Sequence, residues 1–142
     1  ILENITYLVR FPSSEMSEGE FIKTISEETG CGLLLDVTNL YINSQNFGFD
    51  WRVFLDEIPL NRVVQLHFVG SHRHGKRLID AHANRTENEI WRVFAEVCQR
   101  CEIKGAILER DENFPSFQEI LEELETARNL MKNANQAEIS AV

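Results

Sequence analysis

A short stretch of the chain concentrates side chains that can bind a metal ion. Three of the four histidines lie between residues 67 and 74. His67 stands where an apolar run ends, and Asp80 and His82 close the Gly-, His- and Arg-containing stretch that follows. Carboxylate oxygens and imidazole nitrogens are donors for Fe, Mn or Zn. Taken alone, the stretch is equally compatible with a histidine-containing surface loop.

Carboxylates stand at the ends of the other expected strands, at Glu3, Asp36 and Glu109. Charged side chains are seldom buried unless they are paired or bind a metal. Three carboxylates at one end of a parallel sheet repel one another unless a cation or protons compensate them. We therefore predict a metal site with more donors than one tetrahedral zinc ion uses, suited to one or more octahedral ions such as Fe or Mn. The predicted ligands are Glu3, Asp36, Asn39, His67, Asp80, His82 and Glu109.

The alternative is that each acid ends its strand as a turn former or a helix cap. One acid alone favours that alternative, but the recurrence over four successive strands favours a shared site. His72, His74 and Arg110 are accessory candidates, although surface exposure is the preferred interpretation of the two histidines. No catalytic group beyond the metal ligands is assigned. The Cys98–Cys101 pair lies late in an amphipathic helix and has no second pair, which indicates two buried helix-face cysteines.

Strands and helices are expected to alternate along the chain. The predicted strands end at Glu3, Asp36, His67 and Glu109, and loops are expected over residues 40–49 and after His67. A continuous apolar run such as residues 32–37 is typical of a strand that is buried on both faces. Helices are expected after Asp50 and after three capping boxes. These capping boxes are Ser17–Glu20, Thr86–Glu89 and Ser116–Glu119.

Such alternation predicts an α/β fold with parallel strands, either a small doubly wound sheet or part of a (β/α)8 barrel. Two features favour the barrel. No Gly-rich phosphate loop follows any strand, and each strand ends in a potential ligand, where barrel enzymes place their chemistry. A whole barrel needs roughly 250 residues, so residues 1–142 are expected to form about half of one, with a frayed tail over 132–142. The start at Ile1, without a Met, indicates a segment of a longer protein.

The amino-acid composition argues against several classes of function. Of the 142 residues, 43% are hydrophobic and 26% are charged, which is typical of an ordinary globular domain. The formal net charge of −9 argues against binding to nucleic acid or to an anionic membrane. No apolar run is long enough to span a bilayer. Three cysteines, an odd number, fit the reducing cytoplasm better than a disulfide scaffold.

Several motifs occur in the order known from one protein family. They are Leu2-Glu3-Asn4, the loop Arg10–Met16, the segment Gly30–Tyr41, His67–Gly70, Ile79–His82 and Leu108–Asp111. From Ile1 to about Leu130 the chain resembles the multinuclear non-haem iron-dependent oxidative enzymes of the methanobactin-biosynthesis type, formerly a domain of unknown function. The resemblance implies the C-terminal half of a xylose-isomerase-like TIM barrel.

The resemblance also implies an activity. Members hold two or three irons and use O2 to modify cysteines or other residues of a ribosomally made precursor peptide, often with a partner protein that presents the peptide. Glu3, Asp36, His67, Asp80, His82 and Glu109 would be iron ligands, and Asn39 a ligand or a close neighbour of one. The family often has a second histidine four residues after the position of His67, where this chain has Ser71. It also draws histidine ligands from an N-terminal half.

Two alternatives remain at this point. A sugar isomerase or epimerase, or a phosphoesterase, on the same barrel would use Mn, Mg or Zn at carboxylate-rich strand ends. A half-barrel can also be an inactive fragment that only forms a homodimer through its exposed strand edges.

Overall fold

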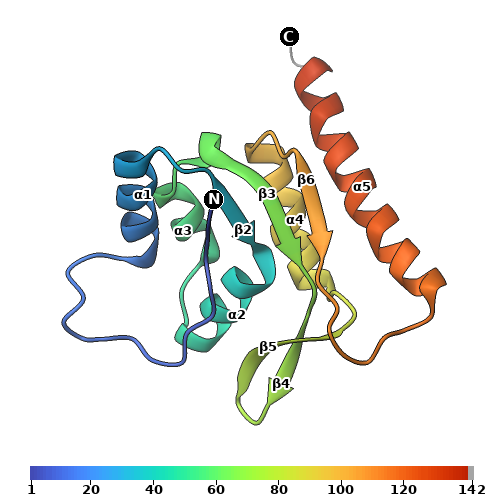
Figure 1. Cartoon of the computed structure of the whole chain (residues 1–142), viewed down its shortest axis with the longest axis horizontal. Coiled ribbons are helices and arrows are strands. Elements are labelled where there is room, and N and C mark those ends of the chain that lie inside the picture. The colour runs from blue at the N-terminus through green and yellow to red at the C-terminus, as the bar shows by residue number, and fades with distance from the viewer. Residues whose placement is uncertain (141–142) are drawn as a thin grey trace.

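A computed structural model of the chain describes residues 1–140, without the side chains of residues 135 and 137–140. Strands and helices alternate along most of it (Figure 1). The strands are β1 (Leu2–Glu3), β2 (Leu33–Asp36), β3 (Val63–Phe68), β4 (Gly70–His74), β5 (Arg77–Asn84) and β6 (Gly105–Leu108). The helices are α1 (Glu18–Thr29), α2 (Val37–Phe47), α3 (Trp51–Glu57), α4 (Asn88–Arg100) and α5 (Phe117–Ser140), with a 3-10 turn at Leu60–Arg62.

Four strands form one parallel sheet in the order β1-β2-β3-β6. The predicted α/β class and the parallel strands are therefore confirmed. Asp36 lies beside His67 in the register of β2 and β3, and His67 lies beside Ile107 in the register of β3 and β6. Because neighbouring strands are parallel, their C-terminal residues meet at one edge of the sheet. No described helix is both long enough and apolar enough to cross a bilayer.

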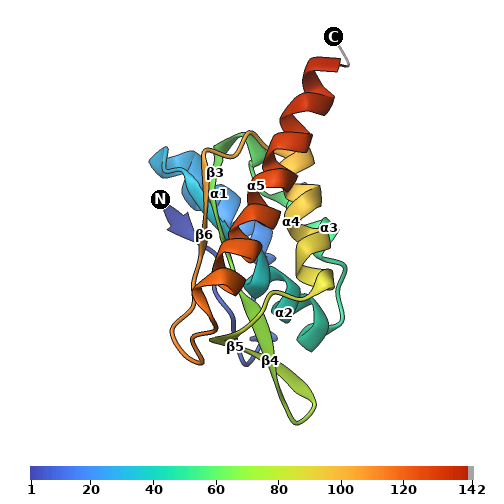
Figure 2. The same ribbon diagram turned by 90° about the vertical axis from the view of Figure 1, so that its right-hand side faces the viewer.

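The helices bury one face of this sheet. Its core-facing side chains alternate with side chains of the other face, as the two-residue period of a strand requires. The core-facing set packs against α4 and other helices, as Figure 2 shows for α4 and α5 beside β3 and β6. It includes Leu2, Leu33, Leu35, Leu66, Phe68, Ala106 and Leu108. The intervening positions, which include Glu3, Asp36, His67 and Ile107, therefore belong to the opposite face.

The helix starts agree with the sequence prediction at three of four places. The Ser17 hydroxyl accepts from the Glu20 amide while the Glu20 carboxylate accepts from the Ser17 amide, the predicted capping box of α1. The same reciprocal pair links Ser116 and Glu119. Asp50 caps α3. Gly30 ends α1 with φ +73°, a left-handed conformation that favours glycine.

The capping box predicted at Thr86–Glu89 is wrong. Among the described residues no side chain caps α4, which begins after Glu87. The Glu87 carboxylate accepts instead from the amide and the hydroxyl of Ser71, and the Thr86 amide donates to Glu123. Both groups are thus used for tertiary contacts.

The loop predicted over residues 40–49 is also wrong, because α2 follows β2 without a break. The Asp36 carboxylate accepts from the Asn39 amide and so caps a helix that ends at Gly48. Polar residues made this segment resemble a loop. In the structure Asn43 is buried and bonds to the backbone of Ile5 and Tyr7, which is a tertiary reason for the helix.

The stretch after His67, predicted as a loop, is a β-hairpin. β4 and β5 pair antiparallel around Gly75, whose φ is +61°. The Asn46 side chain of α2 accepts from the amide of Leu78 and donates to its carbonyl, which holds the hairpin against the body of the protein.

The last helix is held by a buried ion pair. Glu123 of α5 is 1% exposed and accepts from Arg110 at 2.9 Å and from the Thr86 amide at 2.8 Å. Leu124 and Leu130 of α5 pack against the core, whereas Leu121 is exposed. The helix extends to Ser140, and residues 141–142 of the predicted frayed tail 132–142 lie outside the described residues.

We predict that Glu123→Ala lowers the free energy of unfolding by about 3–5 kcal/mol, because it leaves the buried Arg110 guanidinium without its partner. Denaturant unfolding measures this change. Glu125→Ala, at an exposed position of the same helix, is the matched control and should change stability by less than about 0.5 kcal/mol. Equal effects of the two substitutions would contradict the role given to Glu123.

Candidate metal centre

Four side chains from four strand ends converge at one edge of the sheet. Glu3, Asp36, His67 and Glu109 each offer one potential ligand atom, and these atoms all lie within 4.8 Å of one another. Glu3 and Asp36 end β1 and β2, His67 lies one residue before the end of β3, and Glu109 follows β6. The parallel register explains the convergence, because it stacks the strand ends side by side.

His67 stands at the centre of this group. Its Nδ1 lies 3.1 Å from Glu3 Oε1 and 3.0 Å from Glu109 Oε1. Neither oxygen lies in line with a ring N–H, so within the described part of the chain Nδ1 has no hydrogen-bond partner. Two ligands at right angles on an octahedral ion, each bonded at about 2.1 Å, lie about 3.0 Å apart. The separations of Nδ1 from the two oxygens are therefore those of neighbouring ligands on one ion.

Asp36 is the most deeply buried acid of the group, at 1% exposed. Burial raises the pKa of Asp36 to about 8; the Asn39 amide opposes this shift, and the carboxylates of Asp80, Glu3 and Glu109 add to it. At neutral pH the Asp36 carboxyl is therefore protonated in most molecules when no metal is bound. A cation among these carboxylates would replace that proton and relieve the repulsion.

Two buried asparagines fix the geometry around Asp36. The Asn4 amide donates to the Asp36 carbonyl at 2.9 Å and accepts from the Asp36 amide at 2.8 Å. It thereby ties the residue after Glu3 to the end of β2. Asn39 donates to the Asn4 carbonyl, while its Oδ1 is buried and has no partner among the described residues. Asn39 Oδ1 is thus a free acceptor beside the group.

The end of β5 extends the site. His82 Nε2 lies 3.0 Å from Asp80 Oδ2 and 3.6 Å from Glu109 Oε2. Asp80 Oδ1 is buried without a hydrogen-bond partner in the described chain. Burial lowers the pKa of His82, but the carboxylates of Asp80, Asp111 and Glu109 outweigh burial and raise it overall. Glu109 therefore links the four-residue group, of which it is a member, to the Asp80–His82 pair.

The accessory candidates lie elsewhere. His72 and His74 are exposed on β4, outside the convergent group. Arg110 directs its guanidinium away from it, toward Glu123 and the Ala83 carbonyl. Cys98 and Cys101 are buried and free, as predicted. Burial raises the pKa of the Cys98 thiol to about 12 and that of the Cys101 thiol to about 11, so neither is a reactive thiolate.

Two residues that organise the site were not singled out from the sequence. Asn4 bonds to backbone groups of Asp36, and the Asp111 carboxylate lies 3.0 Å from His82 Nδ1, within reach to accept from it. Both lie in motifs that carry the family resemblance, one residue after Glu3 and two residues after Glu109, but neither was given a role. Adjacency to a predicted ligand is a signal that can be searched for in other chains.

A sequence model of one family, described as RiPP precursor modification enzyme MbnB/TglH/ChrH, matches residues 1–132. The chain belongs to this family. The resemblance stated from the motifs is thereby confirmed. A RiPP is a ribosomally made peptide that is modified after synthesis, so the family comprises peptide-modifying enzymes.

Curated relatives of this MbnB/TglH/ChrH family member carry the name UPF0276 protein. One from Chromobacterium violaceum is 34% identical over 136 residues, which cover 96% of this chain and 49% of the relative. One from Shewanella loihica is 39% identical over 125 residues, which cover 87% of this chain and 45% of the relative. One from Pseudomonas aeruginosa is 33% identical over 143 residues, which cover 100% of this chain and 50% of the relative. The chain spans about half the length of the curated relatives it matches.

The raised pKa of Asp36 predicts how stability depends on pH when no metal is bound. The folded-state pKa, about 8, lies above the ordinary value of 3.8. Between these pH values the folded protein holds a proton that the unfolded chain releases, so the free energy of unfolding falls as pH rises from about 4 to 8. Asp36→Asn keeps a good helix cap and removes this contribution, so its stability should fall less steeply.

Denaturant unfolding in the presence of a chelator, repeated across this pH range, measures the slope. Asp50→Asn is the matched control, because it makes the same change at an exposed helix cap and should retain the wild-type slope. If Asp36→Asn and wild type show the same slope, the proton assigned to Asp36 is not there.

Proposed function

We propose that the whole protein is an iron-dependent oxidoreductase that uses O2 to modify residues, with cysteine as the expected target, of a ribosomally made precursor peptide. The observation that carries the proposal is the convergence of Glu3, Asp36, His67 and Glu109 within 4.8 Å in a chain of a peptide-modifying family. A partner protein that presents the peptide is part of the proposal. The net charge of −9 supports a peptide and not a nucleic acid as substrate.

The donor set fits iron. It combines carboxylates, imidazoles and one amide oxygen, and it exceeds the four donors of a tetrahedral zinc site. Two buried acceptors without partners in the described structure, Asn39 Oδ1 and Asp80 Oδ1, are available as further donors. In this proposal Glu3, Asp36, His67 and Glu109 hold one ion, and Asp80, His82 and Asn39 help to hold another beside Glu109. Mn or Zn is the alternative occupant.

The protein groups have separate tasks in this mechanism. Bound iron would supply the reduction of O2 and the oxidation of the substrate. The Asp36 carboxyl loses its proton when the site is filled, because a ligating carboxylate must be ionised. Asn4 holds the end of β1 against the end of β2 through two bonds to the Asp36 backbone. The Asp36 cap and the strand register hold the donors in place.

We further propose that the sheet is half of a xylose-isomerase-like TIM barrel. The helices cover one face, and the donors project from the other, which is the interior face of a barrel. Ile1 and Ile107 are 70% and 45% exposed there. Beside β1 a pocket of about 750 Å³ is lined by residues between 2 and 22, including the exposed Phe11, Met16 and Phe21. Further strands and helices would bury this apolar surface, and relatives of twice the length can supply them.

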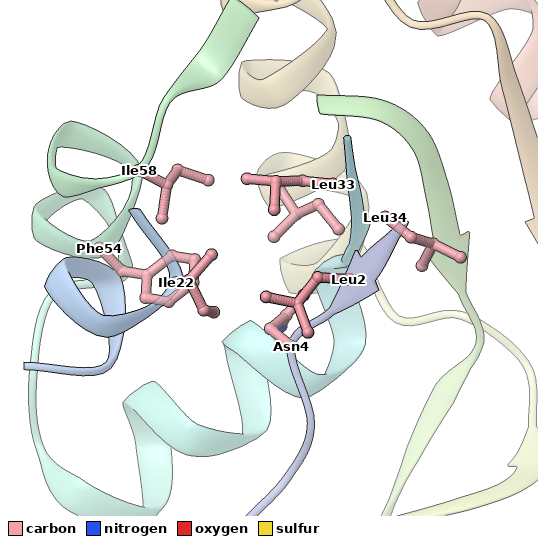
Figure 3. A pocket seen from close by; sticks show the side chains of 8 residues that line it. Leu2, Asn4, Ile22, Leu33, Leu34, Phe54 and Ile58 are labelled. Carbon is pink, nitrogen blue, oxygen red and sulfur yellow. The ribbon is translucent and has the colours of Figure 1, made fainter. Parts of the chain in front are cut away.

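The side chains between β1 and the helices α1 and α3 are closely packed. Figure 3 shows Leu2 and Asn4 of the N-terminal segment facing Ile22, Phe54 and Ile58 across a cavity of about 10 Å³. That volume is at the lower limit for one water molecule. The open surface of β1 therefore lies on its free edge and not beneath it.

Two further predictions are untested. One is that two copies of the chain pair through such strand edges to form a homodimer, and the other is that the protein is located in the cytoplasm.

We predict that the whole protein, expressed without oxygen and supplied with Fe(II), retains at least one iron per chain. His67→Ala should lower metal affinity by more than about 100-fold, because it removes the central donor. His74→Ala is the matched control at the exposed hairpin and should retain the wild-type metal content. Metal analysis after gel filtration gives both results, and mass spectrometry of the precursor peptide after exposure to O2 tests the reaction.

Fewer than one iron per chain with zinc preferred would contradict the proposal. So would strong thermal stabilisation by sugar phosphates or polyols without any response to thiol peptides, since that result indicates an isomerase or phosphoesterase on the same fold.

A further inference from the structure

His82 adopts an unusual backbone conformation at the point where it reaches the candidate centre. Its φ is +48°, in the left-handed region that residues other than glycine seldom occupy. Such a conformation persists only where neighbouring groups hold it, and it is common at functional sites. The groups that hold His82 therefore bear on how its ring is presented.

The loop after β6 supplies these groups. The carbonyl of His82 accepts from the amide of Asp111 at 2.9 Å and from that of Glu112 at 3.4 Å. On the ring, Nδ1 lies 3.0 Å from Asp111 Oδ2. One residue, Asp111, thus contacts both the backbone and the imidazole of His82.

The loop itself is anchored in the protein interior. The Arg110 side chain is buried and donates to Glu123 at 2.9 Å and to the carbonyl of Ala83 at 3.3 Å. Arg110 precedes Asp111 and Ala83 follows His82, so the bond from Arg110 to Ala83 joins the two segments right beside the contact between Asp111 and His82. An exposed side chain would otherwise be free to leave the ring, since 74% of the Asp111 side chain is accessible.

We propose that Asp111 is a positioning residue for His82. Its carboxylate accepts a hydrogen bond from His82 Nδ1–H, so that Nε2 carries no proton and can bind a metal ion beside Asp80 and Glu109. The inference rests on the proposed function, because it assumes that His82 is a ligand. A carboxylate on the far nitrogen fixes the tautomer and the orientation of a ligating imidazole. Asp111 itself touches neither the metal nor the substrate.

Because Asp111 is exposed, its effect on metal binding can be measured separately from its effect on stability. An ion pair with an exposed partner contributes little to stability, so Asp111→Ala should unfold at nearly the wild-type denaturant concentration. Its effect on metal binding should be larger. We expect a 10–100-fold loss of Mn(II) affinity in the weakened site, the usual effect of removing such a partner.

The test is a double-mutant cycle in the whole protein, with Mn(II) as the probe and electron paramagnetic resonance of free Mn(II) as the readout. Asp111→Ala should lower affinity in the wild-type background and change it by less than about twofold in the His82→Ala background, because its effect passes through His82. Asp111→Asn, which retains an acceptor oxygen, should lose less affinity than Asp111→Ala. Glu112→Gln is the control, since only the Glu112 backbone contacts His82, and it should bind as wild type does.

Two results would overturn the inference alone: full affinity in Asp111→Ala, or an equal loss with and without His82. Both are distinct from failure of the proposed function. A wild-type protein that binds neither Mn(II) nor Fe(II) would overturn the proposed function, and this inference with it.

Discussion

The central constraint on this structure is the negative charge of the carboxylates that meet at one edge of its sheet, because that charge must be compensated. Parallel pairing stacks Glu3, Asp36 and Glu109 around the single imidazole of His67. In the described chain these carboxylates have no lysine or arginine partner. Burial raises the pKa of Asp36 and the neighbouring carboxylates add to this shift, so the folded protein retains a proton where an exposed aspartate would lose it. A multivalent cation is the natural counter-charge for such a group.

The same residues serve both the fold and the site. Asp36 ends β2, caps α2 and points its carboxylate at the group. Asn4 continues the contact between β1 and β2 beyond the last paired residues and leaves Asn39 Oδ1 without a partner in the described structure. At the other side, the buried pair of Arg110 and Glu123 anchors the loop that contacts His82. The interpretation of strand-end acids as helix caps and their interpretation as ligands are therefore compatible.

Sequence reasoning succeeded where the signal was local. The apolar runs and the residues that end them predicted the four parallel strands, and the two-residue period of a strand places their terminal donors on one face. The predicted helix after Ser17 and the buried Cys98 and Cys101 were also correct. Each of these features depends on neighbours within one turn or one strand.

The errors share one cause, which is bonding between residues distant in sequence. The polar segment of α2 looked like a loop because the partners of Asn43 and Asn46 lie more than thirty residues away. The hairpin after His67 depends on Asn46 and on the Ser71–Glu87 contact. Thr86 and Glu89 resembled a capping box, but the Thr86 amide bonds to Glu123, and α4 begins after Glu87, whose carboxylate bonds to Ser71. The motifs contained Asn4 and Asp111, but the contacts that give them roles join residues distant in sequence and were not predicted.

Anomalous X-ray diffraction at the iron absorption edge, on crystals of the whole protein grown without oxygen, tests the central claim most directly. The account predicts a strong anomalous peak within bonding distance of Glu3, Asp36, His67 and Glu109, with a second peak beside Asp80 and His82. Crystals that contain iron only at other positions, or that show these four side chains separated in solvent, would contradict it.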